Sequence, residues 1–248
     1  MLSQCSMVRT LLADTSHRMK KGVSKLLAWE IDHVVIFTSP AAPESARLLG
    51  LGLTEATPNT HPGQGTSCRR FTFGNAYLEL LWVHNAEEAR SQLTRPTRLW
   101  DRWSGRGGNG CSIGFCFRPA QPQIADVPFT AWEYRPSYLP NPHCIHIASN
   151  VDVLTEPMLC YLAFAQQRRL SANQGSSLEH AAGPCRLTRV EFVSPQADNI
   201  SPALRGLVEA GLIWLRHGTR CLVELGFNGE SQGKKEDCRP ELPLVLCW

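Results

Sequence analysis

Residues 31–39, Ile-Asp-His-Val-Val-Ile-Phe-Thr-Ser, carry a compact hydrophobic pattern. A β-branched run bounded by charged and turn residues predicts a buried strand. Side chains alternate across a sheet, so one face of this strand would hold a histidine among apolar neighbours, namely Ile31, His33, Val35 and Phe37. His33 is therefore a candidate functional side chain in a layer that should otherwise be apolar.

The following segments predict one helix and three more strands. The Gly-Asn step at 74–75 lies between two strand-like runs and is a good hairpin signal. We expect the helix over residues 44–49 and the strands over 51–56, 67–73 and 76–83. Together with the first strand they form a βαβββ module.

The middle of the chain is less regular. Residues 119–142 are dense in proline, and we expect an ordered excursion with buried aromatic side chains there. The pattern around this excursion predicts a helix from 86 that breaks at Pro96, strands over 111–117 and 143–148, a helix over 157–169, and an exposed loop over 171–183.

A weak internal repeat links the two ends of the chain. Residues 186–195 align with 31–40 through their Ser-Pro pairs, followed by a predicted helix at 201–210. Val-Glu-Leu at 223–225 then matches Leu-Glu-Leu at 78–80. In this register Thr188 stands opposite His33, and Glu224 stands opposite Glu79.

This alignment divides the chain into four parts. They are a basic, disordered extension (1–29), the first module with its following strand (30–118), a proline-rich excursion with a helix and loop (119–185), and a second, degenerate half-module with a tail (186–248). The extension has no secretory signal pattern. A targeting sequence and a disordered extension with Met19 as the true start both remain open.

Composition and charge favour a small-molecule partner over nucleic acid or a membrane. The net charge of +3 and pI near 8.4 are too slight to favour nucleic acid, and no apolar stretch approaches the roughly 20 residues of a membrane-spanning helix. The ten cysteines are spread evenly without a Cys-x-x-Cys pair. We therefore expect a cytoplasmic protein with free buried thiols, a small-molecule partner, and no nucleic-acid or membrane partner. A homodimer remains open.

Several motifs resemble a glyoxalase-like domain of the vicinal oxygen chelate (glyoxalase/bleomycin resistance/extradiol dioxygenase) superfamily. They are Asp-His-Val-Val at 32–35, His-Pro-Gly-Gln-Gly at 61–65, Arg-Phe at 70–71, Tyr-Leu-Glu-Leu-Leu at 77–81 and, less clearly, Tyr-Arg-Pro-Ser-Tyr-Leu-Pro at 134–140. The resemblance implies an α+β fold in which paired βαβββ modules with curved mixed sheets enclose a cavity.

The resemblance also implies a divalent ion (Zn, Mn, Fe or Ni) in that cavity. It assigns His33, Glu79 and Glu224 as ligands, whereas Thr188 in the fourth place is a poor ligand for such an ion. In an alternative threading, residues 111–117 begin the second module and offer Ser112 and Cys116 but no histidine.

Residue chemistry leaves two interpretations of Glu79. It shares a strand face with apolar neighbours, where a buried carboxylate is costly unless it is paired or bound to metal. A metal role and an ion pair with Arg69 or Arg70 across the hairpin both remain open.

Further candidates surround this core. His61 is expected to contact substrate or to stabilise its turn. Tyr134, Arg135 and Tyr138 are expected to line the cavity and bind an anionic substrate group, or to serve packing and a surface ion pair. Cys144 and His146 share a strand face and could meet one ion, whereas neighbouring His143 faces away.

Two functions compete on these grounds. The first is a metal-assisted isomerase, lyase or dioxygenase acting on a small oxygenated molecule, with Glu224 or Glu79 moving a proton. The second is a metal-free binding or resistance protein that sequesters its ligand, which the incomplete ligand set favours. A structural protein with a degenerate cavity is a third interpretation.

Overall fold

The computed structural model describes residues 28–108, 110–122, 126–165, 180–181 and 183–248. Most of the predicted N-terminal extension and of the predicted loop at 171–183 lies outside the described residues. Among the described residues, no helix is long and apolar enough to cross a membrane.

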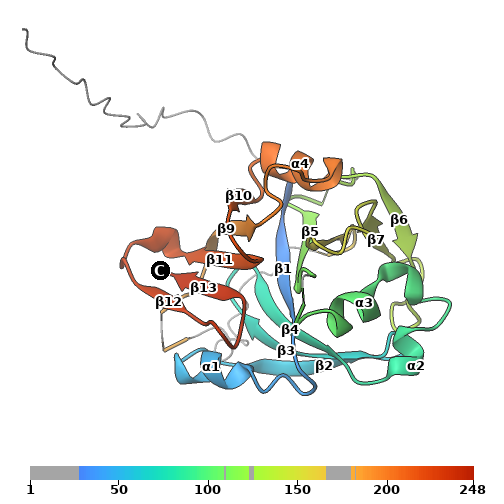
Figure 1. Cartoon of the computed structure of the whole chain (residues 1–248), viewed down its shortest axis with the longest axis horizontal. Helices are drawn as coiled ribbons and strands as arrows, with labels where there is room; N and C mark the ends of the chain where they lie inside the picture. The colour runs from blue at the N-terminus through green and yellow to red at the C-terminus, as the bar shows by residue number, and fades with distance from the viewer. Residues whose placement is uncertain (1–27, 109, 123–125, 166–179, 182) are drawn as a thin grey trace, which may run out of the picture.

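The described chain has an α+β fold built on two mixed sheets (Figure 1). The larger sheet has eight strands, and β1 and β5 pair antiparallel at its centre. Across the sheet the strands are β2 (Ala56–His61), β3 (Thr66–Thr72), β4 (Tyr77–Val83), β1 (Trp29–Phe37), β5 (Ile113–Pro119), β8 (Met158–Tyr161), β7 (Ile145–Ala148) and β6 (Ala131–Tyr134).

The first half of this sheet is the predicted βαβββ module. Strand β1 leads through α1 (Ser45–Gly50) to β2, β3 and β4, and β4 returns parallel to β1. The strand predicted at 51–56 is displaced, because Gly52 takes a positive φ of 83° and Leu53 packs into the core as the chain leaves α1. Strand β2 therefore begins at Ala56.

The second half of the large sheet comes from β5 to β8, as in the alternative threading. Strand β8 pairs parallel with β5, just as β4 pairs parallel with β1. The helix predicted from residue 157 is wrong where the chain is described, because Met158–Tyr161 is a strand with mostly buried residues. A short apolar run buried on both faces has no periodicity that separates strand from helix.

Three short helices connect the two halves. They are α2 (Ala86–Ala89), the 3-10 helix η1 (Arg95–Thr97) and α3 (Leu99–Ser104). Asn85 caps α2 by accepting hydrogen bonds from two backbone N–H groups, and Pro96 lies in the first turn of η1, which separates α2 from α3.

Residues 187–247 form a separate five-stranded sheet. Its strand order is β10 (Trp214–His217), β9 (Leu187–Ser194), β11 (Leu222–Phe227), β13 (Leu244–Cys247) and β12 (Lys235–Asp237), with α4 (Pro202–Glu209) after β9 and η3 (Asn228–Glu230) after β11. In Figure 1 these orange and red strands lie to one side of β1. The internal repeat thus marks a second sheet, and it does not supply the partner half of the first.

The two sheets share one hydrophobic core. Val34 and Ile36 of β1 belong to the same buried cluster as Val223 and Leu225 of β11. The rings of Phe115 and Phe192 pack edge to face with centroids 6.0 Å apart. One face of β1 therefore packs toward the smaller sheet, and the alternate residues of β1 are free to line a cavity.

Arg118 links several strands of the large sheet through a buried guanidinium. It donates to Glu30 (2.9 Å), to Asp32 (2.7 Å) and to the carbonyl of Asn75 in the β3–β4 turn (2.6 Å). Burial alone would raise the pKa of Asp32, but the hydrogen bond from His33 and the charges of His33 and Arg118 hold it below its usual value of 3.8. Asp32 is therefore ionised at neutral pH.

Replacing Arg118 by methionine tests how much the ion pairs of Arg118 with Glu30 and Asp32 stabilise the fold. The change removes one partner of a buried ion pair and leaves the Asp32 carboxylate without its guanidinium, which typically costs about 3–5 kcal/mol. We expect the free energy of unfolding, measured by urea titration at pH 7, to fall by about that amount.

Arg47→Met is the matched control, because Arg47 pairs with Glu236 at a partly exposed site and its loss should cost under about 1 kcal/mol. The stabilisation by Asp32 is present above pH 3.8 and is lost as the pH falls through its lowered pKa, so the deficit of Arg118→Met should narrow in acid. Equal losses in the two variants would contradict this assignment.

Candidate functional site

A cavity of about 300 Å³ lies on the face of the large sheet that carries His33. Its walls are mainly apolar and include Phe37, Leu81, Ile147 and Met158 from both halves of the sheet. A wider hollow of about 620 Å³ at Arg95, Arg98, Trp132 and Asp152 lies elsewhere on the surface and has no histidine or cysteine in its lining. The smaller cavity is the candidate site because it gathers imidazole, carboxylate and thiol groups.

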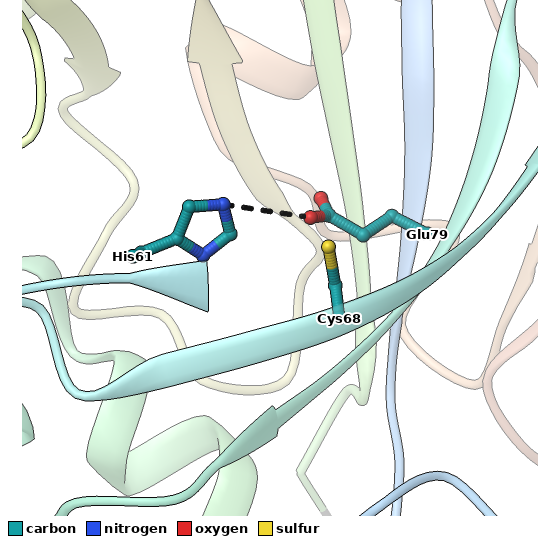
Figure 2. Close-up of side chains that lie close together, drawn as sticks. All are labelled: His61, Cys68 and Glu79. Atoms are coloured by element: carbon teal, nitrogen blue, oxygen red, sulfur yellow. Dashed lines mark ion pairs between the residues drawn. The ribbon is translucent and has the colours of Figure 1, made fainter. Parts of the chain in front are cut away.

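The Glu79 carboxylate lies between two imidazoles inside this cavity. His33 Nε2 is 3.5 Å from Glu79 Oε2, and His61 Nε2 is 4.0 Å from Glu79 Oε1. Figure 2 shows His61 directed at the carboxylate. His33 and Glu79 thus meet within the separation of about 5 Å that a shared ion would require.

The arginines that could have paired with Glu79 bind elsewhere. Arg69 pairs with Glu55, and Arg70 donates to the Thr57 carbonyl at 2.7 and 3.0 Å. Among the described residues, the ion pairs recorded for Glu79 are with the two histidines alone. The structural pairing that the sequence left open is therefore absent from the described part of the chain.

His33 is held in a defined orientation. Its Nδ1 donates to Asp32 Oδ2 at 2.8 Å, because an ionised carboxylate can only accept. The Tyr77 ring stacks on the imidazole with centroids 4.4 Å apart. These contacts direct Nε2 at Glu79 and the cavity, in the arrangement that orients a metal ligand or a proton-transfer group.

His61 ends β2, and hydrogen bonds also fix its ring. Its Nδ1 lies 2.9 Å from Thr66 Oγ1, which accepts from Gln64 at 2.8 Å, and the Asn59 amide nitrogen lies 3.1 Å from Nε2. This pattern assigns the proton to Nδ1 and the lone pair to Nε2. Burial lowers the pKa of His61, and the charge of Glu79 opposes that shift only in part. The ring is therefore neutral at pH 7.

Cys68 is a site residue that sequence reasoning missed. It lies on β3, and its sulfur is within 4.8 Å of both a nitrogen of His61 and an oxygen of Glu79 (Figure 2). Burial and the neighbouring Glu79 raise the pKa of Cys68, so its thiol is protonated and hydrogen-bonds to the carboxylate. The hairpin register, which puts Cys68 opposite Leu81 and Arg70 opposite Glu79, was the signal that could have revealed it.

The second half of the sheet supplies no imidazole or carboxylate to the lining of this cavity among the described residues. Cys116 on β5 stands opposite His33 in the strand register, and Cys160 on β8 pairs with Cys116. Burial raises the pKa of the Cys116 thiol. The imidazole and carboxylate groups of the described cavity lining therefore all come from the first half of the sheet.

Glu224 does not reach the site, and its assignment as a ligand and proton carrier is corrected here. It lies on β11 of the smaller sheet, where Arg216 pairs with it at 2.7 Å, Lys235 at 3.5 Å and Arg189 at 3.9 Å. The neighbours of Glu224 along β11 face the shared core, so strand alternation turns Glu224 away from it. The repeat alignment matched a β-strand of the wrong sheet.

Only some of the predicted substrate-binding residues line the cavity. Tyr134 lines the cavity, with its hydroxyl 3.4 Å from Thr94 Oγ1. Arg135 is exposed, pairs with Glu133 at 2.5 Å and does not line the cavity. Tyr138, next to His61, does line it and donates to Gln64 at 3.3 Å.

Residues 31–127 match the family model of a glyoxalase-like domain. These residues are thus similar to a glyoxalase-like domain, in agreement with the resemblance drawn from the sequence motifs. The match spans the first half of the large sheet and β5. No curated relative matches the chain significantly.

Solved structures resemble this chain at low identity. A hypothetical protein from Staphylococcus aureus is 10% identical, with 88% of this chain and 98% of that chain covered and a TM-score of 0.48. A methylmalonyl-CoA epimerase in complex with methylmalonyl-CoA and NH4+ is 15% identical, with 58% and 99% covered and a TM-score of 0.38. A methylmalonyl-CoA epimerase from Mycobacterium tuberculosis is 11% identical, with 58% and 93% covered and a TM-score of 0.34. At these scores the likenesses carry no argument about activity.

NMR titration of His61 in the metal-free protein tests how burial and the charge of Glu79 affect the pKa of this ring. We expect its pKa below 6.5, because burial disfavours the imidazolium ion. Glu79→Gln should lower that pKa further, since it removes the negative charge that favours protonation.

Glu224→Gln is the control and should leave the His61 titration unchanged, because Glu224 lies in the other sheet. A His61 pKa that rises in Glu79→Gln would show that the carboxylate and imidazole do not interact as described.

Proposed function

We propose that the cavity binds a small oxygenated molecule next to a divalent ion held at Glu79. One observation carries the proposal: a buried carboxylate faces two imidazoles and has no recorded lysine or arginine partner among the described residues. Such a carboxylate is costly to bury unless a cation compensates its charge. The oriented Nε2 atoms make a metal ion a suitable cation.

The donor set fits a divalent transition metal. Imidazole nitrogen and carboxylate oxygen are common ligands of Zn, Mn, Fe and Ni, and a site with few protein ligands leaves positions open for substrate. When bound, such an ion would act as a Lewis acid that polarises a substrate carbonyl. Glu79 and an imidazole beside it would hold the ion, since His33 and His61 both approach this carboxylate.

The remaining groups suit binding and proton transfer. The apolar wall, including Leu81 and Ile147, would exclude water and hold an apolar substrate body. His33, oriented through Nδ1 by Asp32, would accept a substrate proton at Nε2 and return it. This combination favours isomerase or lyase chemistry on a small carbonyl compound over dioxygenase chemistry.

A metal-free binding protein is the second candidate, and a specific observation favours it. The second half of the sheet adds only thiols and uncharged side chains to the described cavity lining. His33 already contacts Asp32 at 2.8 Å and Glu79 at 3.5 Å, and these contacts need no metal.

Glu79→Gln separates the two candidates, because it keeps the shape of the side chain and removes its charge. If Glu79 holds an ion, the metal content of untagged protein purified without chelator should fall by roughly tenfold or more, as expected when a site loses a charged ligand. Elemental analysis of the purified variant measures this, with the thermal midpoint as a check of folding.

Glu224→Gln is the matched control and should retain wild-type metal content. Phenylpyruvate, a 2-oxo acid with an apolar body, serves as the ligand probe in calorimetry. Equal metal content in wild type and Glu79→Gln, with phenylpyruvate binding that survives chelation, would favour the metal-free candidate.

A further inference from the structure

We propose that the ion is held by His61, Cys68 and Glu79, three side chains of the first half of the sheet, with His33 outside the ligand set. This inference rests on the proposed function, since it names the ligands of the ion at Glu79. It also separates two roles in the cavity, metal binding and proton transfer.

The geometry distinguishes these three residues from His33. A nitrogen of His61, the Cys68 sulfur and a carboxylate oxygen of Glu79 all lie within 4.8 Å of one another. His33 is not part of this mutually close set, and it approaches the second carboxylate oxygen of Glu79, Oε2. One ion can therefore reach the three donors more readily than it can reach both histidines.

The three donors come from adjacent strands, which fixes their arrangement. His61 ends β2, Cys68 lies on β3 and Glu79 on β4, and all three are buried. Bonds of about 2.0–2.3 Å to nitrogen, oxygen and sulfur require donors roughly 3.3–3.8 Å apart in a tetrahedral site. The His61–Glu79 distance of 4.0 Å needs only a small side-chain rotation to meet this requirement.

The surroundings of His61 fit a ligand role. Its Nδ1 contacts Thr66, which Gln64 holds in turn, so Nε2 presents its lone pair toward Glu79. Metal-binding histidines commonly donate their other ring N–H in this way. Ion binding would have to displace only the weak 3.1 Å contact from the Asn59 amide.

The types of ligand atom in this set favour zinc. A thiolate beside imidazole and carboxylate favours zinc over the harder ions Mg and Mn. Three protein ligands with a fourth position facing the cavity describe the catalytic type of zinc site. His61 and Glu79 line the cavity, so the open position would face the substrate, and His33 would remain free to transfer a proton.

A second group of donors, Glu133, Cys144 and His146, supplies a control. Their ligand atoms also lie within 4.8 Å of one another, but Glu133 is exposed and is paired with Arg135. Any metal bound there must be separated from metal bound at Cys68, which the variants below achieve.

Cobalt(II) titration of the metal-free protein tests the ligand set, because a cobalt–thiolate bond gives a near-ultraviolet charge-transfer absorption. We expect wild type to bind about one ion per chain with this absorption and to release about one proton as the Cys68 thiol ionises. Cys68→Ser should lose the absorption, whereas Cys144→Ser and Cys160→Ser should keep it.

His33→Gln should keep both the absorption and a cobalt affinity within roughly threefold of wild type, since His33 is not a ligand. An absorption that persists in Cys68→Ser, or that disappears in His33→Gln, would overturn this ligand set. Cobalt bound without thiolate absorption, and lost in Glu79→Gln, would overturn the ligand set and leave the proposed function standing. If the wild-type protein binds neither cobalt nor zinc, both the ligand set and the metal site of the proposed function are wrong.

Discussion

The buried guanidinium of Arg118 is the contact on which the arrangement of the site depends. It joins β5 to Glu30 and Asp32 of β1 and to the turn before β4. Through Asp32 it also holds the His33 ring, so one cation fixes both the central strand pair and the direction of an imidazole. A site group on β1 is thus positioned by a side chain that faces away from the solvent and never enters the cavity lining.

The cavity is chemically asymmetric although the sheet around it is built from two similar halves. The first half supplies His33, His61 and Glu79, and the second half supplies an apolar wall with Cys116 and Cys160. Because of this asymmetry, neither threading places an imidazole or a carboxylate of the second half in the described cavity lining. On the proposed function, the first half alone would hold the ion, and the second half would shape the space for substrate.

The sequence predicted the first half well because its signals are local. The strand around His33, the hairpin at residues 74–75 and the shared face of Glu79 and Leu81 follow from alternation and turn chemistry, and the structure has them. The error at Glu224 arose because a βα repeat describes a supersecondary unit and not the sheet it joins. Cys68 was missed because its role depends on cross-strand contacts, which no periodicity along one strand reveals.

The central claim is that Glu79 binds a metal ion in the cavity, and anomalous diffraction from zinc-soaked crystals of the full chain tests it most directly. The account predicts an anomalous peak about 2 Å from a Glu79 carboxylate oxygen. A fully occupied peak elsewhere, with the Glu79 carboxylate in contact only with the two histidines, would contradict it.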